Sequence, residues 1–173
     1  MSIATDLLNE LKLEAQVTRR YLERVPFDKA TYKPHEKSEQ LGRLAIHIAE
    51  ILSWWKSCIE SNELNFVDFK PEDISSTEEV LAYFDKLLNE AEAALKNASD
   101  SVFDAQWSMC YGEEVLFTLP KKQVARIFCM NHFIHHRAQL GVYLRLLGIS
   151  VPATYGPSAD DEKILLVREF PVS

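Results

Sequence analysis

Apolar residues recur at helical spacing through long stretches of this chain, and this periodicity restricts its fold more than any other feature. In residues 3–25 they occupy one face of a predicted helix, which ends at Pro26. A second helix is predicted after Ser38, a residue suited to cap it, and a third over residues 75–98. Between these two, residues 61–75 form a linker long enough for a crossover. Only 5 glycines interrupt the 173 residues, so little in the sequence opposes long helices.

A fourth helix is predicted from Lys121 to Leu147, with Gly148 in the usual position of a C-terminal cap. Four amphipathic helices of roughly 20 residues or more predict an all-α four-helix bundle, and residues 1–173 fit a single such domain. Residues 103–119 are the exception, because their short aromatic pattern suits a short hairpin or an extended segment.

Charge and composition argue against several classes of partner. The formal net charge is -7, which disfavours binding to nucleic acid or to an anionic membrane surface. No segment has 18 consecutive apolar residues, and the N-terminus lacks the pattern of a signal peptide. The three cysteines, Cys58, Cys110 and Cys129, are odd in number and form no CxxC pair. A soluble protein of the reducing cytoplasm, without a disulfide framework, is therefore predicted.

Three of the five histidines lie within one and a half turns of the fourth predicted helix. His132 and His136 are four residues apart, so both side chains leave the same face about one turn apart. This spacing places two imidazole nitrogens on one metal ion in HExxH helices. Here Phe133 stands where the catalytic glutamate of that motif would be, which removes the base of a metalloprotease.

A third imidazole is available on the second helix. His47 shares an apolar face with Leu44, Ile51 and Trp54, and it meets His132 and His136 if the two helical faces meet in the core. Three neutral imidazoles suit one divalent ion such as Zn or Ni, with water in the remaining position. Helical geometry alone leaves open the alternative that these are buried core histidines with hydrogen-bond partners.

Neighbouring residues are weighed as ligands in the same way. His135 lies on a more polar arc of the helix than His136, so His136 is the predicted ligand and His135 lies outside the set. Cys129 is better explained as a small buried hydrophobic residue. Glu50 follows His47 by three residues, but one HxxE pair does not make a di-iron carboxylate site.

Two stretches of the chain resemble one known family. The sequence HFIHHRAQLGVYLRLLG, followed by VPATYGPSADD, is similar to the fourth helix and tail of the DinB family, which is grouped with the YfiT-like metalloenzymes. The segment YLERVPFDKATYKPHEKSEQLGRLAIHIAEILSWW matches the same family in order and content. The resemblance spans about residues 20–162.

The resemblance implies a four-helix bundle, often a homodimer, with one divalent metal held by His47, His132 and His136. His35, in the loop KPHEKS, is not implied as a ligand. Some relatives are thiol S-transferases that use bacillithiol, mycothiol or a similar small thiol, and others resemble maleylpyruvate isomerases.

The function expected from the resemblance is metal-dependent transfer of a small thiol, or metal-dependent hydrolysis. The alternatives are a non-catalytic metal-binding stress-response protein and a metal-free bundle that binds a partner. A metal with an open position would favour the nucleophilic thiolate form of a bound thiol. Four nearby polar residues are weaker candidates to orient a substrate: Glu50, Asn131, Gln139 and Tyr143.

Overall fold

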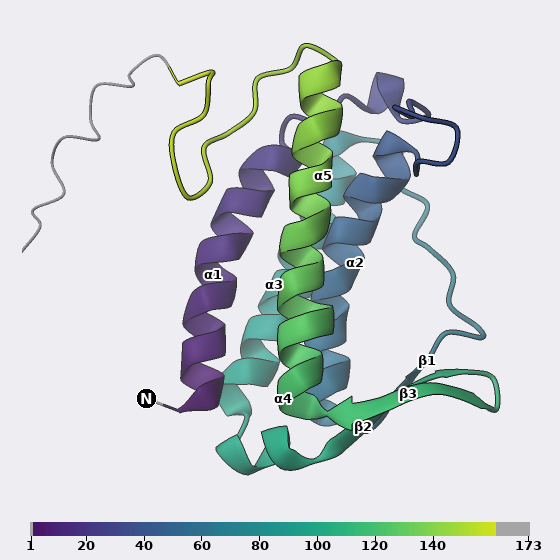
Figure 1. Cartoon of the computed structure of the whole chain (residues 1–173), viewed down its shortest axis with the longest axis vertical. Helices are drawn as coiled ribbons and strands as arrows, with labels where there is room; N and C mark the ends of the chain where they lie inside the picture. The colour runs from purple at the N-terminus through teal and green to yellow at the C-terminus, as the bar shows by residue number, and fades with distance from the viewer. Residues whose placement is uncertain (1, 162–173) are drawn as a thin grey trace, which may run out of the picture.

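A computed structural model describes residues 2–161 and shows four long helices, each within a stretch of helical periodicity (Figure 1). Three are single α-helices, and the fourth contains a π-helical segment, η3, between α4 and α5. In chain order the helical elements are α1 (Ile3–Leu22), η1 (Phe27–Lys29), α2 (Leu41–Glu60), α3 (Thr77–Asn97), η2 (Asp100–Asp104), α4 (Lys121–Val124), η3 (Ala125–Asn131) and α5 (His132–Leu146). Within residues 2–161, none of these helices combines the length and the apolar character needed to cross a bilayer.

The helices pack side by side, with α1 and α2 each in contact with both α3 and α5. α2 and α3 run in the same direction, and residues 61–76 return along the outside of the bundle to join them, as the length of this linker allowed (Figure 1). Trp55, Phe84 and Phe133 are completely buried in the core. The rings of Phe84 on α3 and Phe133 on α5 stack with their centroids 6.2 Å apart, so side chains of these two helices meet across the core.

The all-α prediction is wrong, because one end of the bundle carries a three-stranded mixed sheet (Figure 1). β2 (Gln106–Tyr111) and β3 (Glu114–Pro120) form an antiparallel hairpin, and β1 (Glu63–Asn65) pairs with β2 in parallel. Gly112 opens the two-residue hairpin loop with φ +61°, a conformation that glycine adopts without steric cost. A strand of three residues is too short to show a periodicity, and β1 exists only because the crossover brings it beside β2.

The sheet is fixed to the helices through its aromatic residues. Trp107 on β2 is 1% exposed, and its indole N–H donates to the Ser57 carbonyl at 3.3 Å near the end of α2. Phe117 on β3 stacks on Phe128 of η3, with centroids 4.5 Å apart. The sheet therefore supports the π-helical segment that leads directly into α5.

The start of α2 differs from the sequence prediction. α2 begins at Leu41 with Gln40 at the N-cap and no capping side chain, so the prediction that Ser38 caps this helix is wrong. The first amide groups of the helix are satisfied by the preceding loop instead. Leu41 N–H donates to the Tyr32 carbonyl and Gly42 N–H to the Ala30 carbonyl, both at 2.9 Å.

The C-terminal end of α5 agrees with its prediction. Gly148 has φ +72°, and its N–H donates to the Arg145 carbonyl at 3.0 Å. Residues 149–161 form no strand and cross the outer side of the bundle (Figure 1). Tyr21 of α1 holds them there, since its hydroxyl donates to the Pro152 carbonyl at 2.9 Å. The remainder of the predicted tail, 162–173, lies outside the described residues.

A buried ion pair joins α1 to α5. Arg137, 2% exposed, pairs with the Glu14 carboxylate and also donates to the Glu14 carbonyl at 3.3 Å. The Tyr155 hydroxyl accepts from Arg137 Nη2 at 2.7 Å and donates to Glu14 Oε1 at 2.8 Å. The tail thereby reaches the buried ion pair through the hydroxyl of Tyr155, whose side chain is otherwise largely exposed.

Replacing Ser76 with alanine is expected to lower the free energy of unfolding by about 1 kcal/mol, the usual loss for an N-cap. Ser76 is the N-cap of α3, and its hydroxyl accepts from the Glu79 amide at 3.1 Å. Urea denaturation measures the change. Ser99→Ala is the control, because Ser99 precedes η2 without capping it, and an equal loss in both variants would contradict the capping role.

Candidate metal centre

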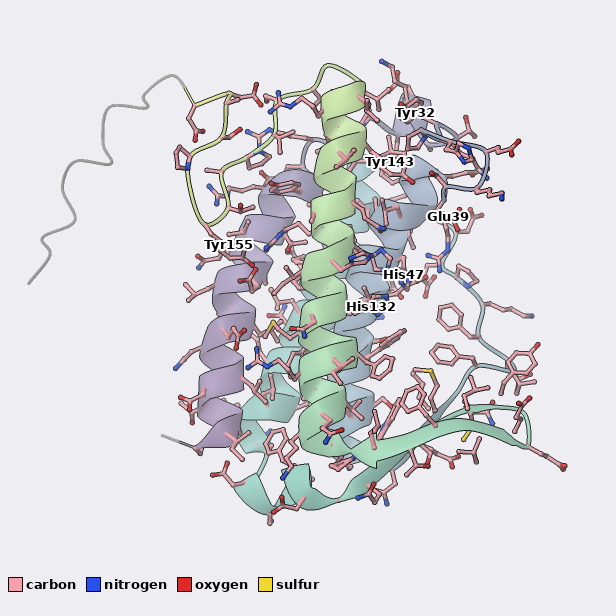
Figure 2. The ribbon with its side chains drawn as sticks, in the orientation of Figure 1. Tyr32, Glu39, His47, His132, Tyr143 and Tyr155 are labelled. Carbon is pink, nitrogen blue, oxygen red and sulfur yellow. The ribbon has the colours of Figure 1, made fainter. Side chains whose placement is uncertain are left out.

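His47 reaches the candidate site from the middle of α2. Its neighbours Ile46 and Ile48 are buried in the core, whereas the His47 side chain is 25% exposed at the edge of the helix-packing surface. This edge faces α5, which contacts α2 along the bundle. Figure 2 shows the His47 imidazole pointing toward α5 at the height of His132.

The other two histidines come from the start of α5. η3 precedes His132 immediately, and a π-helical turn, with its wider hydrogen-bonding pattern, frequently occurs at functional sites. The buried face of α5 is centred on Phe133, Arg137 and Leu140, so His132 and His136 lie at its edge rather than in the middle of an apolar stripe. Both imidazoles are therefore half-buried.

The three imidazoles converge through their Nε2 atoms. The distance between His132 Nε2 and His136 Nε2 is 2.7 Å, and that between His47 Nε2 and His132 Nε2 is 3.5 Å. One nitrogen from each of the three residues lies within 4.8 Å of the other two. The structure thus brings His47, His132 and His136 together, and their binding of a metal ion stays a prediction.

Burial keeps two of these imidazoles neutral. The pKa of His132 is lowered to about 4, first by desolvation and then by the charges of His136 and His47. Desolvation likewise lowers the pKa of His136 to about 4, although its bond to Gln139 opposes this shift. A neutral imidazole has a free lone pair on one nitrogen, so these side chains meet the requirement for ligating a metal near pH 7.

Two of the three Nδ1 atoms, those of His47 and His136, lie near hydrogen-bond acceptors. Glu50 Oε2 lies 3.4 Å from His47 Nδ1, and Gln139 Oε1 lies 2.7 Å from His136 Nδ1. His132 Nδ1 is buried without a well-formed hydrogen bond in the described residues, although the Phe128 carbonyl acts to raise its pKa. An acceptor at Nδ1 puts the proton there and leaves Nε2 free for a metal.

The free energy of unfolding of the metal-free protein is expected to fall as the pH drops from about 6.5 toward 4. In this window the unfolded chain takes up protons that folded His132 and His136 do not accept, because their pKa values are lowered to about 4. Each histidine adds a slope of up to about 1.4 kcal/mol per pH unit. Urea denaturation at several pH values, in the presence of a chelator, measures how the free energy of unfolding depends on pH. This dependence should be weaker in His132→Gln, and an unchanged dependence would contradict the lowered pKa of His132.

A cleft of about 730 Å³ opens beside the cluster, between α2, α5 and the loop that precedes α2. His47 and His136 line this cleft, together with Arg43, Gln139 and Tyr143. Figure 2 shows Tyr32, Glu39 and Tyr143 beyond His47 toward the end of the bundle, and the Tyr143 hydroxyl donates to the Glu39 carbonyl at 3.0 Å. A small molecule in the cleft can therefore reach two of the three imidazoles.

Aromatic rings close another side of the cluster. The ring of Trp54 lies 5.1 Å from that of His132 and 6.3 Å from that of His47, measured between centroids. Phe66, from the crossover segment, packs on Trp54 at 5.7 Å. The cluster thus has an apolar wall as well as a polar cleft, which reduces its access to water.

The neighbouring candidate residues divide between the cleft, the core and solvent. His135 is exposed and lies outside the group of three, and Cys129 is fully buried in the core. Gln139 and Tyr143 line the cleft, whereas Asn131 does not. Sequence reasoning missed Arg43, whose Nη2 donates to Glu50 Oε2 at 2.7 Å. The i, i+4 and i+7 spacing of Arg43, His47 and Glu50 is the signal that would have found it.

A mostly helical bundle with three convergent imidazoles beside a cleft defines a protein with a site suited to one metal ion. The sequence model of the DinB family matches residues 1–165, and the chain belongs to this family. The resemblance noted in the sequence is therefore confirmed.

Two crystal structures share the fold. One is a DinB-like protein, YjoA, from Bacillus subtilis, at 19% identity and a TM-score of 0.68, covering 86% of this chain and 96% of that chain. The other is a DinB-like protein from Bacillus cereus, at 19% identity and a TM-score of 0.64, covering 86% and 95%. None of the curated proteins compared with the chain matches it.

Proposed function

We propose that this DinB-family protein binds one divalent cation through His47, His132 and His136 and catalyses the transfer of a small thiol to an electrophile. The observation that carries the proposal is the convergence of three Nε2 atoms beside a cleft that two of the imidazoles line. Zn and Ni are the candidate ions, because both accept imidazole ligands.

The ligand set favours a catalytic site over a structural one. In the described residues the cluster has three members, and structural zinc sites are closed by four protein ligands. When bound, a divalent cation with three neutral ligands keeps its double charge and an open position, where it lowers the pKa of a thiol or of water. The alternative is a non-catalytic metal-binding stress-response protein. Activity in an assay excludes this alternative, and absence of activity supports it.

The cleft residues have distinct roles in this proposal. Gln139 holds the ring of His136 through Nδ1, and Tyr143 is fixed by its bond to the Glu39 carbonyl. Lys37 and Glu39 give the cleft lining one charge of each sign, and the charge of Arg43 is paired with that of Glu50. Trp54 and Phe66 shield the imidazoles from solvent.

Metal analysis and a thiol assay test the proposal together. Protein purified without a chelator is expected to carry one divalent ion per chain and to consume a low-molecular-weight thiol in the presence of an alkyl or aryl halide. Chelation should stop this consumption, and added Zn²⁺ or Ni²⁺ should restore it. Hydrolysis of an ester is the second assay. A protein that binds metal but neither consumes any thiol of a panel nor hydrolyses the ester would favour the non-catalytic alternative. Absence of metal would overturn the proposal itself.

Association into a homodimer, as the family resemblance implies, and a cytoplasmic location, as the cysteine pattern predicts, remain part of the proposal. Analytical ultracentrifugation over a wide range of protein concentrations tests the dimer, and sedimentation as a monomer throughout would contradict it.

A further inference from the structure

We infer that Glu50 is a positioning residue for the metal site, which fixes the tautomer of His47 and directs its Nε2 toward His132 and His136. The inference rests on the proposed function, because it assigns a role in holding the same cation. Glu50 does not line the cleft, so the inference assigns a role in the metal site to a residue outside it.

The geometry places Glu50 between two partners on its own helix. Glu50 is 2% exposed, and its Oε2 atom accepts from Arg43 Nη2 at 2.7 Å and lies 3.4 Å from His47 Nδ1. Arg43, His47 and Glu50 occur at spacings of four and three residues on α2, so one helical face holds all three. Glu50 is not among the residues that line the cleft, so it acts through His47 and not on a substrate.

The chemistry of the pair determines which nitrogen of His47 is free. An ionised carboxylate only accepts hydrogen bonds, so the proton of a neutral His47 belongs on Nδ1 and the lone pair on Nε2. His47 Nε2 is the atom that lies 3.5 Å from His132 Nε2. A carboxylate behind a ligating imidazole also increases its basicity, and such partners commonly account for a 10- to 100-fold difference in metal affinity.

His47 is distinguished from the other two histidines by this partner. Gln139 offers His136 a neutral amide oxygen, and the Phe128 carbonyl is the group that acts on His132. Arg43 neutralises the charge of Glu50 within hydrogen-bonding distance, so the carboxylate can stay ionised in a buried position.

The Arg43–Glu50 pair is poorly explained as a device for stability alone. Glu50 Oε1 and Arg43 Nη1 are buried without hydrogen-bond partners in residues 2–161. An ion pair that leaves buried polar atoms unsatisfied gains little stability, because their desolvation is not compensated. The contact of Glu50 with a histidine of the cluster accounts for a buried charge at this position.

Co²⁺ binding to Glu50→Gln tests the inference, since Co²⁺ reports ligand geometry through its visible absorption. The variant is expected to bind Co²⁺ about 10- to 100-fold more weakly than wild type, with a shifted visible spectrum. Its metal-free form is expected to unfold at a lower urea midpoint than wild type, because Arg43 loses its anionic partner, so Co²⁺ binding is measured without denaturant on protein shown to be folded. Glu90→Gln is the matched control, because Glu90 forms an exposed pair with Lys56 on the neighbouring helix, and it should bind Co²⁺ as wild type does.

Glu50→Asp provides a second variant if Glu50→Gln does not fold. It keeps the charge but withdraws the carboxylate by one methylene, so a smaller loss of affinity with a spectral shift in the same direction is expected. A folded Glu50 variant with the affinity and the spectrum of wild type overturns the inference while leaving the metal site intact. If wild-type protein binds no Co²⁺, Zn²⁺ or Ni²⁺, the proposed function fails, and the inference fails with it.

Discussion

Replacing His136 with alanine is expected to empty the metal site and to abolish thiol consumption. His136 supplies one of three converging Nε2 atoms, 2.7 Å from that of His132, and it is also one of the two imidazoles that line the cleft. Loss of a residue that only hydrogen-bonds to a metal ligand lowers metal affinity about 10- to 100-fold, so loss of a ligand itself should lower the affinity by a larger factor. Isothermal titration with Zn²⁺ or Ni²⁺ and metal analysis of the purified variant measure the effect.

His135→Ala is the matched control for this experiment. His135 is adjacent in sequence and carries the same side chain, but it is exposed and lies outside the group of three. The control is expected to keep one metal ion per chain and most of its activity. If His135→Ala loses the metal and His136→Ala retains it, the ligand assignment is wrong. If both variants consume thiol as wild type does, the metal-dependent mechanism has to be abandoned.

Only the part of the candidate site that His132 and His136 form could be predicted from local spacing. The i, i+4 spacing of His132 and His136 determines that both lie on one side of any α-helix that contains them. His47 was harder to place, because its approach depends on which faces of two helices meet in the bundle. The family resemblance supplied that pairing, and periodicity alone left the buried-core alternative open.

The hairpin of β2 and β3 was one of the predicted alternatives for residues 103–119, but the third strand, β1, and the π-helical segment could not be predicted in the same way. β1 is a three-residue strand that pairs with a hairpin more than 40 residues later, so its conformation depends on tertiary structure. η3 contains apolar residues as an ordinary α-helix does, so its wider hydrogen-bonding pattern cannot be recognised from residue types. Neither β1 nor η3 leaves a distinct periodic pattern in the sequence.

The buried ion pair of Arg137 and Glu14 was not predicted, although each charged residue lies within an apolar stripe of its helix. Arg137 lies four residues after Phe133 and three before Leu140, both completely buried, so a helix that buries those two also buries Arg137. Glu14 likewise lies between Leu11 and Thr18 on the buried side of α1. Two opposite charges on the buried faces of two helices predict an ion pair between them.

Replacing Arg137 with methionine is expected to lower the free energy of unfolding by about 3–5 kcal/mol, the range measured when one partner of a buried ion pair is removed. The change leaves the Glu14 carboxylate, 8% exposed, without its cationic partner, and only the Tyr155 hydroxyl still donates to it. Urea denaturation of the metal-free protein measures the loss. Tyr155→Phe, which removes one hydrogen-bonding hydroxyl, is expected to lose about 1 kcal/mol.

The double variant Glu14→Leu with Arg137→Met separates the cost of an unpaired charge from the value of the pair. Because replacing a whole buried pair by apolar groups is often neutral, the double variant is expected to recover most of the stability that Arg137→Met loses. Arg137 points toward α1 and not toward the histidines, so both variants should still bind one metal ion per chain. A double variant as unstable as the single one would show that the guanidinium contributes through its packing, and that the unpaired carboxylate is not the source of the loss.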